Sequence, residues 1–208
     1  MDIEQTSLMA RINISVEQSV FEDFSSQAER QDKTLYTFTN ESLSAVAKIS
    51  AEGGNPSDLY KLWTSVCLLK QIDAITLPSY FIDELIATLY ARDKKGLLKM
   101  FQDLGSELVG VFKIAAKNLD ELEKLAKDFV PILPLKQFRI DRLDETTIEV
   151  AIVGAGRRIE STECTLEFLK SVLNGYGYTA TKNEVNIGTI RLWASKPAPS
   201  SLHDFRLR

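Results

Sequence analysis

A short alternating segment, Arg11 to Val16, constrains the fold more than any other part of the sequence. It reads RINISV, with Ile12, Ile14 and Val16 on one side and polar residues on the other. Period-2 alternation of this kind indicates a β-strand with one apolar face. Helix-like sequence follows directly, so the strand has no partner nearby in its own chain. Because an unpaired strand edge needs another strand, we expect the same segment of a second copy to supply it.

Two helical patterns follow this segment. Residues 17–30 carry apolar side chains at helical spacing, and residues 31–33 form a polar break. A second helix is predicted to begin at Thr34, because a threonine hydroxyl is a common N-cap. The glycines at 53 and 54 end it. Strand, helix, turn and helix are therefore expected within residues 11–52.

This order resembles the ribbon-helix-helix family of DNA-binding dimers, of the Arc and MetJ type. The resemblance covers about residues 9–52 and is carried by RINISV, VFEDFSSQAERQDKTLY and TNESL. In that family two strands pair into an antiparallel ribbon that enters the major groove, and the second helix begins against a phosphate. By position, the side chains expected to face base edges are those of Arg11, Asn13 and Ser15. The backbone amides expected to face a phosphate are those of Lys33, Thr34 and Leu35.

Two features depart from the family's pattern. Residues 1–50 carry four basic and eight acidic side chains, a net charge of −4, whereas DNA affinity depends largely on neutralised phosphates. The turn at 31–33 also has no glycine, which many family members have there. The residues therefore leave open a second interpretation, in which the ribbon-helix-helix fold only dimerises.

The composition is that of a soluble protein with a substantial core. The 208 residues are 44% hydrophobic, carry a net charge of −4 and have a pI near 5.2. One large domain or two small ones are both compatible with this length. No stretch approaches the roughly 20 apolar residues of a membrane span, and the acidic N-terminus does not resemble a signal peptide. Cys67 and Cys164 do not form a disulfide framework, so we expect packed thiols in a cytoplasmic protein.

The clearest boundary in the chain is the run AEGGNP at 51–56. It separates a ribbon-helix-helix domain at 1–52 from a C-terminal domain at 57–196, which a flexible tail at 197–208 follows. The helices expected in the C-terminal domain cover about 57–73, 79–90, 96–117 and 119–130, with a polar corner at 92–95 and Asn118 as an N-cap.

The rest of the C-terminal domain changes period. Alternating segments at 138–143 and 146–153 predict a β-hairpin. A helix is expected over about 161–174 and should stop at Gly175. Residues 178–195 predict a last strand or a strand pair, with a bulge or a turn at Gly188. The domain is therefore expected to be α+β, with an antiparallel sheet.

This order of elements resembles the 4-vinyl reductase type of small-molecule-binding domain over about residues 78–195. The similar pieces are LGSEL at 104–108, NLDELEKL at 118–125, IEVAIVGAGRRIESTECTLEFLKSVLNGYGY and NEVNIGTIRLWA. Many members place metal-binding cysteines around the last strand, where this chain has none, and Cys164 alone does not make a metal site. The resemblance implies a small apolar ligand, while the spread of aromatic residues fits a pocket or a solid core equally well.

Catalytic constellations are poorly represented. The single histidine, His203, lies in the tail, so no nucleophile–histidine pair can be placed on rigid structure. Gly154-Ala155-Gly156 follows a strand, but Ile159 stands where a dinucleotide-binding loop has its third glycine, and a turn is the simpler interpretation. Arg157 and Arg158 beside it could meet an anionic ligand or partner. We expect no catalytic residue, no metal and no cofactor.

These features predict a cytoplasmic homodimer, joined through residues 11–50, that binds double-stranded DNA as a transcriptional regulator. Its C-terminal domain would sense a ligand or a partner. The alternative is a dimeric module that does not bind DNA and whose C-terminal domain binds a small apolar ligand or a protein partner. Neither hypothesis includes an enzyme activity or a membrane.

Overall fold

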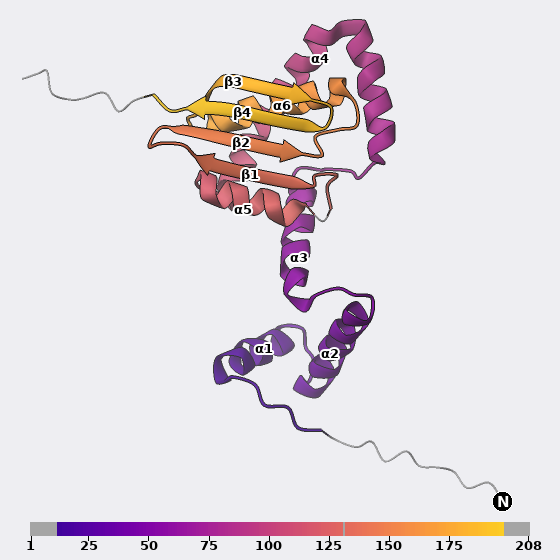
Figure 1. Ribbon diagram of the computed structural model, residues 1–208. Coiled ribbons are helices and arrows are strands. Elements are labelled where there is room, and N and C mark those ends of the chain that lie inside the picture. The colour runs from indigo at the N-terminus through magenta and orange to yellow at the C-terminus, as the bar shows by residue number, and fades with distance from the viewer. Residues whose placement is uncertain (1–11, 131, 198–208) are drawn as a thin grey trace, which may run out of the picture. The chain divides into compact units, whose positions relative to one another are not determined.

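The computed structural model describes residues 12–130 and 132–197. The chain divides into two compact units, Met1–Asp58 and Leu59–Arg208, with the division inside helix α3 (Pro56–Gln71). The described residues contain six helices and one four-stranded antiparallel sheet, so the fold class is α+β (Figure 1).

The first unit contains helices α1 (Gln18–Arg30) and α2 (Leu35–Ala51). Thr34 is the N-cap of α2, as its sequence position predicts, and its hydroxyl accepts a hydrogen bond of 3.2 Å from the amide of Thr37. The two helices meet through the rings of Phe24 and Phe38, whose centroids lie 4.5 Å apart.

The turn between α1 and α2 contains a left-handed residue that is not a glycine. Asp32 has a left-handed backbone, with φ of 52°, and aspartate is one of the residues that tolerate this region. The amide of Lys33 then donates to the carbonyl of Ala28 at 3.0 Å, which closes the C-terminus of α1. The missing glycine is therefore no obstacle to a tight helix–turn–helix.

The expected strand at 11–16 is not formed within the single chain. Residues 12–17 belong to no helix or strand, and Arg11 lies outside the described residues. A strand of this kind needs a neighbour, so pairing with a second copy stays a prediction.

In the second unit the sheet follows two long helical segments. Helix α4 (Ser79–Ala115) and helix α5 (Leu119–Phe129) precede strands β1 (Gln137–Arg142) and β2 (Thr147–Val153). Helix α6 (Ile159–Gly175) comes next, followed by β3 (Thr179–Asn186) and β4 (Thr189–Ser195). The strand order is β1-β2-β4-β3, and every neighbouring pair is antiparallel. The predicted hairpin at 138–153 is confirmed, and residues 178–195 form a strand pair that turns at Gly188.

Helices cover one face of this sheet. The alternate residues Ile148, Val150 and Ile152 of β2 are almost fully buried, as are those of β4, and they form one core with α5 and α6. Helix α6 lies behind the sheet in Figure 1, and α4 packs on α6. That approach is close at Gly105, where an added Cβ would lie 2.6 Å from the carbonyl oxygen of Phe168. The opposite face of the sheet carries charged side chains, as is common in antiparallel sheets.

One sequence expectation for the helices is confirmed, and two need correction. Helices are expected at 79–90 and 96–117 with a polar corner between them, and α4 is indeed broken there, because Asp93 has a non-helical backbone with φ of −153° and ψ of 79°. Asp93 Oδ1 accepts a hydrogen bond of 2.8 Å from the amide of Gly96, which lets the second half begin as a capped helix. Helix α6 begins at Ile159, before the expected start, and includes Gly175. The left-handed glycine after α6 is Gly177, with φ of 83°.

The N-cap predicted for α5 is confirmed. The side chain of Asn118 accepts a hydrogen bond of 3.0 Å from the amide of Glu121, and a carboxylate oxygen of Glu121 accepts one of 2.7 Å from the amide of Lys117. This pair resembles a capping box, except that Glu121 accepts from the residue before the N-cap, and it fixes where α5 begins. The tail expected at 197–208 lies, after Pro197, outside the described residues.

Candidate functional site

The residues expected to contact DNA lie along one extended segment and at one helix start. Asn13 and Ser15 are exposed in the segment before α1. Thr34 and Leu35 stand at the start of α2, where the first amides of a helix have no carbonyl partner within it. The Lys33 amide donates to the Ala28 carbonyl at 3.0 Å, so of the three amides expected to face a phosphate this one already has a partner.

The apolar side of the same segment is open in the single chain. Ile12, Ile14 and Val16 are exposed by 85%, 62% and 60% respectively. Among residues 12–58, the side chain that reaches full burial is Ala28, at 2% exposure. A folded unit normally buries much more apolar surface than this, so the first unit has an apolar face without a cover.

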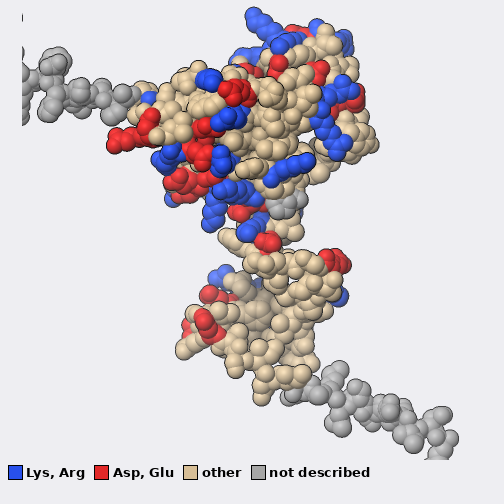
Figure 2. All heavy atoms as spheres, viewed as in Figure 1, with Lys and Arg blue, Asp and Glu red and all other residues tan. Residues whose placement is uncertain are grey.

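Positive charge on the first unit is sparse. The side of it that Figure 2 shows is largely uncharged, with a few acidic and basic side chains at its edges. The ammonium of Lys33 lies 2.6 Å from a carboxylate oxygen of Glu41, so this cation next to the start of α2 already has a partner. Both observations limit how much phosphate the unit can neutralise.

The glycine loop before α6 is occupied by the protein's own carboxylate. Gly154 and Gly156 have left-handed backbones, with φ of 95° and 110°. The buried carboxylate of Asp83, from α4, accepts hydrogen bonds of 3.3 and 3.4 Å from the amide of Arg157. A carboxylate at a helix N-terminus takes the place that a phosphate would need. This geometry supports the interpretation of the loop as a turn, and no sequence pattern pointed to Asp83 as its partner.

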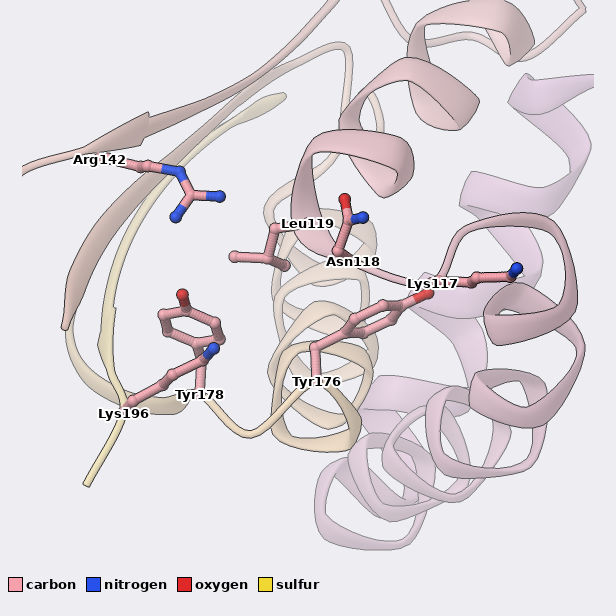
Figure 3. Close-up of a pocket in the computed structure, with 7 residues that line it drawn as sticks. All are labelled: Lys117, Asn118, Leu119, Arg142, Tyr176, Tyr178 and Lys196. Atoms are coloured by element: carbon pink, nitrogen blue, oxygen red, sulfur yellow. The ribbon is translucent and has the colours of Figure 1, made fainter. Parts of the chain in front are cut away.

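A small pocket of about 140 Å³ lies at one end of the strands in the second unit. Its lining comes from the start of α5, the end of β1, the link between α6 and β3, and the residue after β4. The lining residues, drawn in Figure 3, are Lys117, Asn118, Leu119, Arg142, Tyr176, Tyr178 and Lys196. None of them was expected from the sequence, because their approach depends on the order of the strands.

A second hollow, a groove of about 530 Å³, lies beside the kink of α4. It is lined by Leu89, Arg92, Asp93, Gly96, Leu97 and Met100. The groove is open to solvent, unlike the enclosed apolar pocket that the small-molecule resemblance implies. An apolar ligand therefore stays a prediction.

The two cysteines differ in burial. Cys164 is fully buried in a small cluster with Ile86 and Leu97, and burial raises the pKa of its thiol to about 11. It is a packed, protonated thiol, as expected. Cys67 is only partly buried. In residues 12–130 and 132–197, no cluster of three or more His, Cys, Asp or Glu side chains could hold a metal ion.

Comparisons with known proteins give no assignment: no family model, curated protein or solved structure matches the chain. Within the part of the chain that the structure describes, every helix is too short or too polar to cross a bilayer.

Proposed function

We propose that the chain is a homodimeric DNA-binding regulator whose first unit forms a ribbon-helix-helix with a second copy. The observation that carries the proposal is the open apolar side of residues 12–16. Ile12, Ile14 and Val16 alternate with polar residues and stay largely exposed in a unit with almost no core of its own. A second copy, paired strand to strand, covers this side and supplies the missing neighbour.

The polar side of the same strand then forms the DNA-binding surface. Asn13 and Ser15 alternate with the apolar residues, so they lie on the opposite side of the ribbon, together with Arg11. Two adjacent strands fit the width of the major groove. In this proposal a backbone phosphate lies at the capped start of α2, where it accepts from the amides of Thr34 and Leu35.

The second unit acts in this proposal as a domain that senses a ligand or a partner. It has its own core of sheet, α5 and α6, so it does not need the first unit in order to fold. A ligand there changes DNA binding only if it prefers one arrangement of the two first units over another.

A second function is favoured by charge. With four basic and eight acidic residues in positions 1–50, and Lys33 paired with Glu41 at 2.6 Å, the first unit has few cations to offer DNA. In this alternative the fold only dimerises, and the second unit carries the function by binding a small apolar ligand or a protein partner.

Selection from random DNA duplexes at low salt separates the two functions. The regulator should enrich one symmetric motif, because two copies of the ribbon read two half-sites. Arg11→Ala should weaken binding to that motif by about 1–3 kcal/mol and relax one base preference. Arg30→Ala is the matched control, since it removes the same charge from the last turn of α1 instead of from the strand segment at 11–16.

The outcomes are distinct. If no motif is enriched, the regulator proposal fails and the dimerising module takes its place. If Arg11→Ala and Arg30→Ala weaken binding equally, the contact is one of general charge rather than base recognition.

A further inference from the structure

The small pocket of the second unit collects positive charge at one end of the strands. Arg142 is the last residue of β1, and Lys196 directly follows β4. Ser195 pairs with Thr147 at the start of β2, and the Lys196 amide donates to the Thr146 carbonyl at 2.9 Å. The antiparallel order therefore carries Arg142 and Lys196 to the same end of the strands, although more than fifty residues separate them in the sequence.

The charges that line this pocket have one sign. The lining includes the three cationic side chains of Lys117, Arg142 and Lys196 and no carboxylate. In Figure 3 the guanidinium of Arg142, the hydroxyl of Tyr178 and the ammonium of Lys196 gather on one side of Leu119, while the Lys117 ammonium points away. The start of α5 adds a helix N-terminus, whose partial charge is also positive.

One polar group in the pocket lacks a partner. Tyr178 is 3% exposed, and its hydroxyl makes no hydrogen bond with any residue that the structure describes. Its ring is fixed by the Lys196 ammonium, which lies 4.7 Å from the ring centroid. The neighbouring Tyr176 differs, because its hydroxyl donates to the Ala116 carbonyl at 2.7 Å. The hydroxyl oxygen is not among the buried polar atoms, so it is accessible from the pocket and free to donate to something that enters it.

We propose that this pocket binds a small oxyanion, held by the Tyr178 hydroxyl, the Arg142 guanidinium and the Lys196 ammonium. A volume of about 140 Å³ suits a phosphate-sized group, and pockets for drug-sized molecules are larger, at roughly 300–1,000 Å³. Guanidinium and ammonium groups are the usual partners of phosphate, and a neutral hydroxyl adds a directed donor. The site is independent of DNA binding by the first unit.

A carboxylate at the rim moderates this site. Asp120 accepts hydrogen bonds of 2.9 and 3.0 Å from Arg142, and these raise the pKa of the guanidinium above its ordinary value. Asp120 itself does not line the pocket and is largely exposed, so it competes with a bound anion for Arg142 from outside. Removing its charge should therefore strengthen anion binding.

The test is calorimetric titration of the full chain with inorganic phosphate, in a buffer free of other oxyanions and at constant ionic strength. We expect saturable binding with a Kd on the order of 1 mM. Tyr178→Phe and Lys196→Met should each weaken it about tenfold, because each removes one directed contact. Asp120→Asn should strengthen it severalfold.

Matched controls exist for each variant. Lys182→Met removes an exposed lysine that stacks on Trp193 at 4.5 Å, the counterpart of Lys196 on Tyr178. Asp141→Asn breaks an arginine–aspartate pair of 2.6 Å on the same strand as Arg142. Tyr60→Phe removes a hydroxyl from a side chain that is 79% exposed. None of the three should change the affinity for phosphate.

The source of the anion is distinguished by a second titration with adenosine monophosphate. Equal affinities indicate a free oxyanion, and tighter binding of the nucleotide indicates the phosphate group of a larger ligand. The proposal is overturned by an absence of saturation up to about 20 mM, well above the expected Kd. It is also overturned if the pocket variants and their controls behave alike. Lys196 is exposed, so Lys196→Met keeps the test decisive even if Tyr178→Phe fails to fold.

Discussion

Replacing Ile14 with lysine should separate the proposed dimer into monomers. In the single chain Ile14 is 62% exposed, so a lysine there costs the monomer almost nothing. In the paired ribbon the exposed part of the side chain becomes buried. Burying a whole isoleucine side chain contributes about 1.5–3 kcal/mol, so the exposed fraction contributes about 1–2 kcal/mol in each copy.

The symmetry of the dimer doubles this loss. Because a two-fold interface contains the same residue from both copies, the lost burial amounts to about 2–4 kcal/mol. Desolvating two ammonium groups adds further cost. A total above about 4 kcal/mol raises the dimer Kd roughly a thousandfold. Ile187→Lys is the matched control, since Ile187 is 64% exposed at the turn between β3 and β4.

Sedimentation velocity over a concentration series measures this effect directly. The wild type and Ile187→Lys should be dimers at micromolar concentration, and Ile14→Lys should be monomeric. Dissociation should also lower the helical circular dichroism signal, because α1 and α2, with 13 and 17 residues, have little core to hold them. A wild-type chain that is monomeric at micromolar concentration would refute the reasoning, as would an Ile14→Lys dimer of unchanged affinity.

Replacement by alanine should have opposite effects at two glycines of α4, measured as the free energy of unfolding in urea. In Gly105→Ala the new Cβ meets the Phe168 carbonyl, so the free energy of unfolding should fall by about 1–3 kcal/mol. In Gly110→Ala the new Cβ points into open space, so the free energy of unfolding should rise by about 0.5–1 kcal/mol. Equal effects of the two variants would contradict the close approach of α4 to α6. Hydrogen bonds from the Thr146 amide and its neighbours lower the pKa of Asp144 from 3.8 to about 2, so its stabilising effect is present above its unfolded-state pKa and is lost as pH falls. The difference in Tm between wild type and Asp144→Ala should therefore be constant at neutral pH and shrink between about pH 4 and pH 2, and a difference that persists to pH 2 would contradict this.

Elements with purely local signals were predictable from the sequence. The hairpin at 137–153 follows from alternation on both sides of a polar turn, and the caps at Thr34 and Asn118 follow from residue type and position. The break inside α4 was also predictable, because the polar run at 92–95 interrupts the helical pattern. The sequence pattern did not show that Asp93 itself leaves the helical conformation and caps the second half.

The oxyanion pocket could not have been predicted, for a reason of topology. Arg142, Tyr178 and Lys196 meet only because β4 inserts between β2 and β3, and strand order is set by packing across the whole sheet. The same holds for Asp83, whose carboxylate reaches the amide of Arg157 from a helix that lies 74 residues earlier. Sequence patterns report which face of an element is apolar, and they carry little information on which distant element will cover that face.

The two functions proposed for the first unit share one fold and differ in the positive charge that they require. The sequence-independent part of DNA affinity grows with the number of phosphates that cations neutralise. Lys33, in the turn before α2, is already paired with Glu41 at 2.6 Å. The strand segment at 11–16 contains one basic residue, Arg11. Asn13, Ser15 and the amides at the start of α2 can donate to DNA without carrying a charge. A regulator built in this way depends on base contacts and helix amides, with a shallow response to salt, whereas a module that only dimerises requires nothing but the apolar side of the strand.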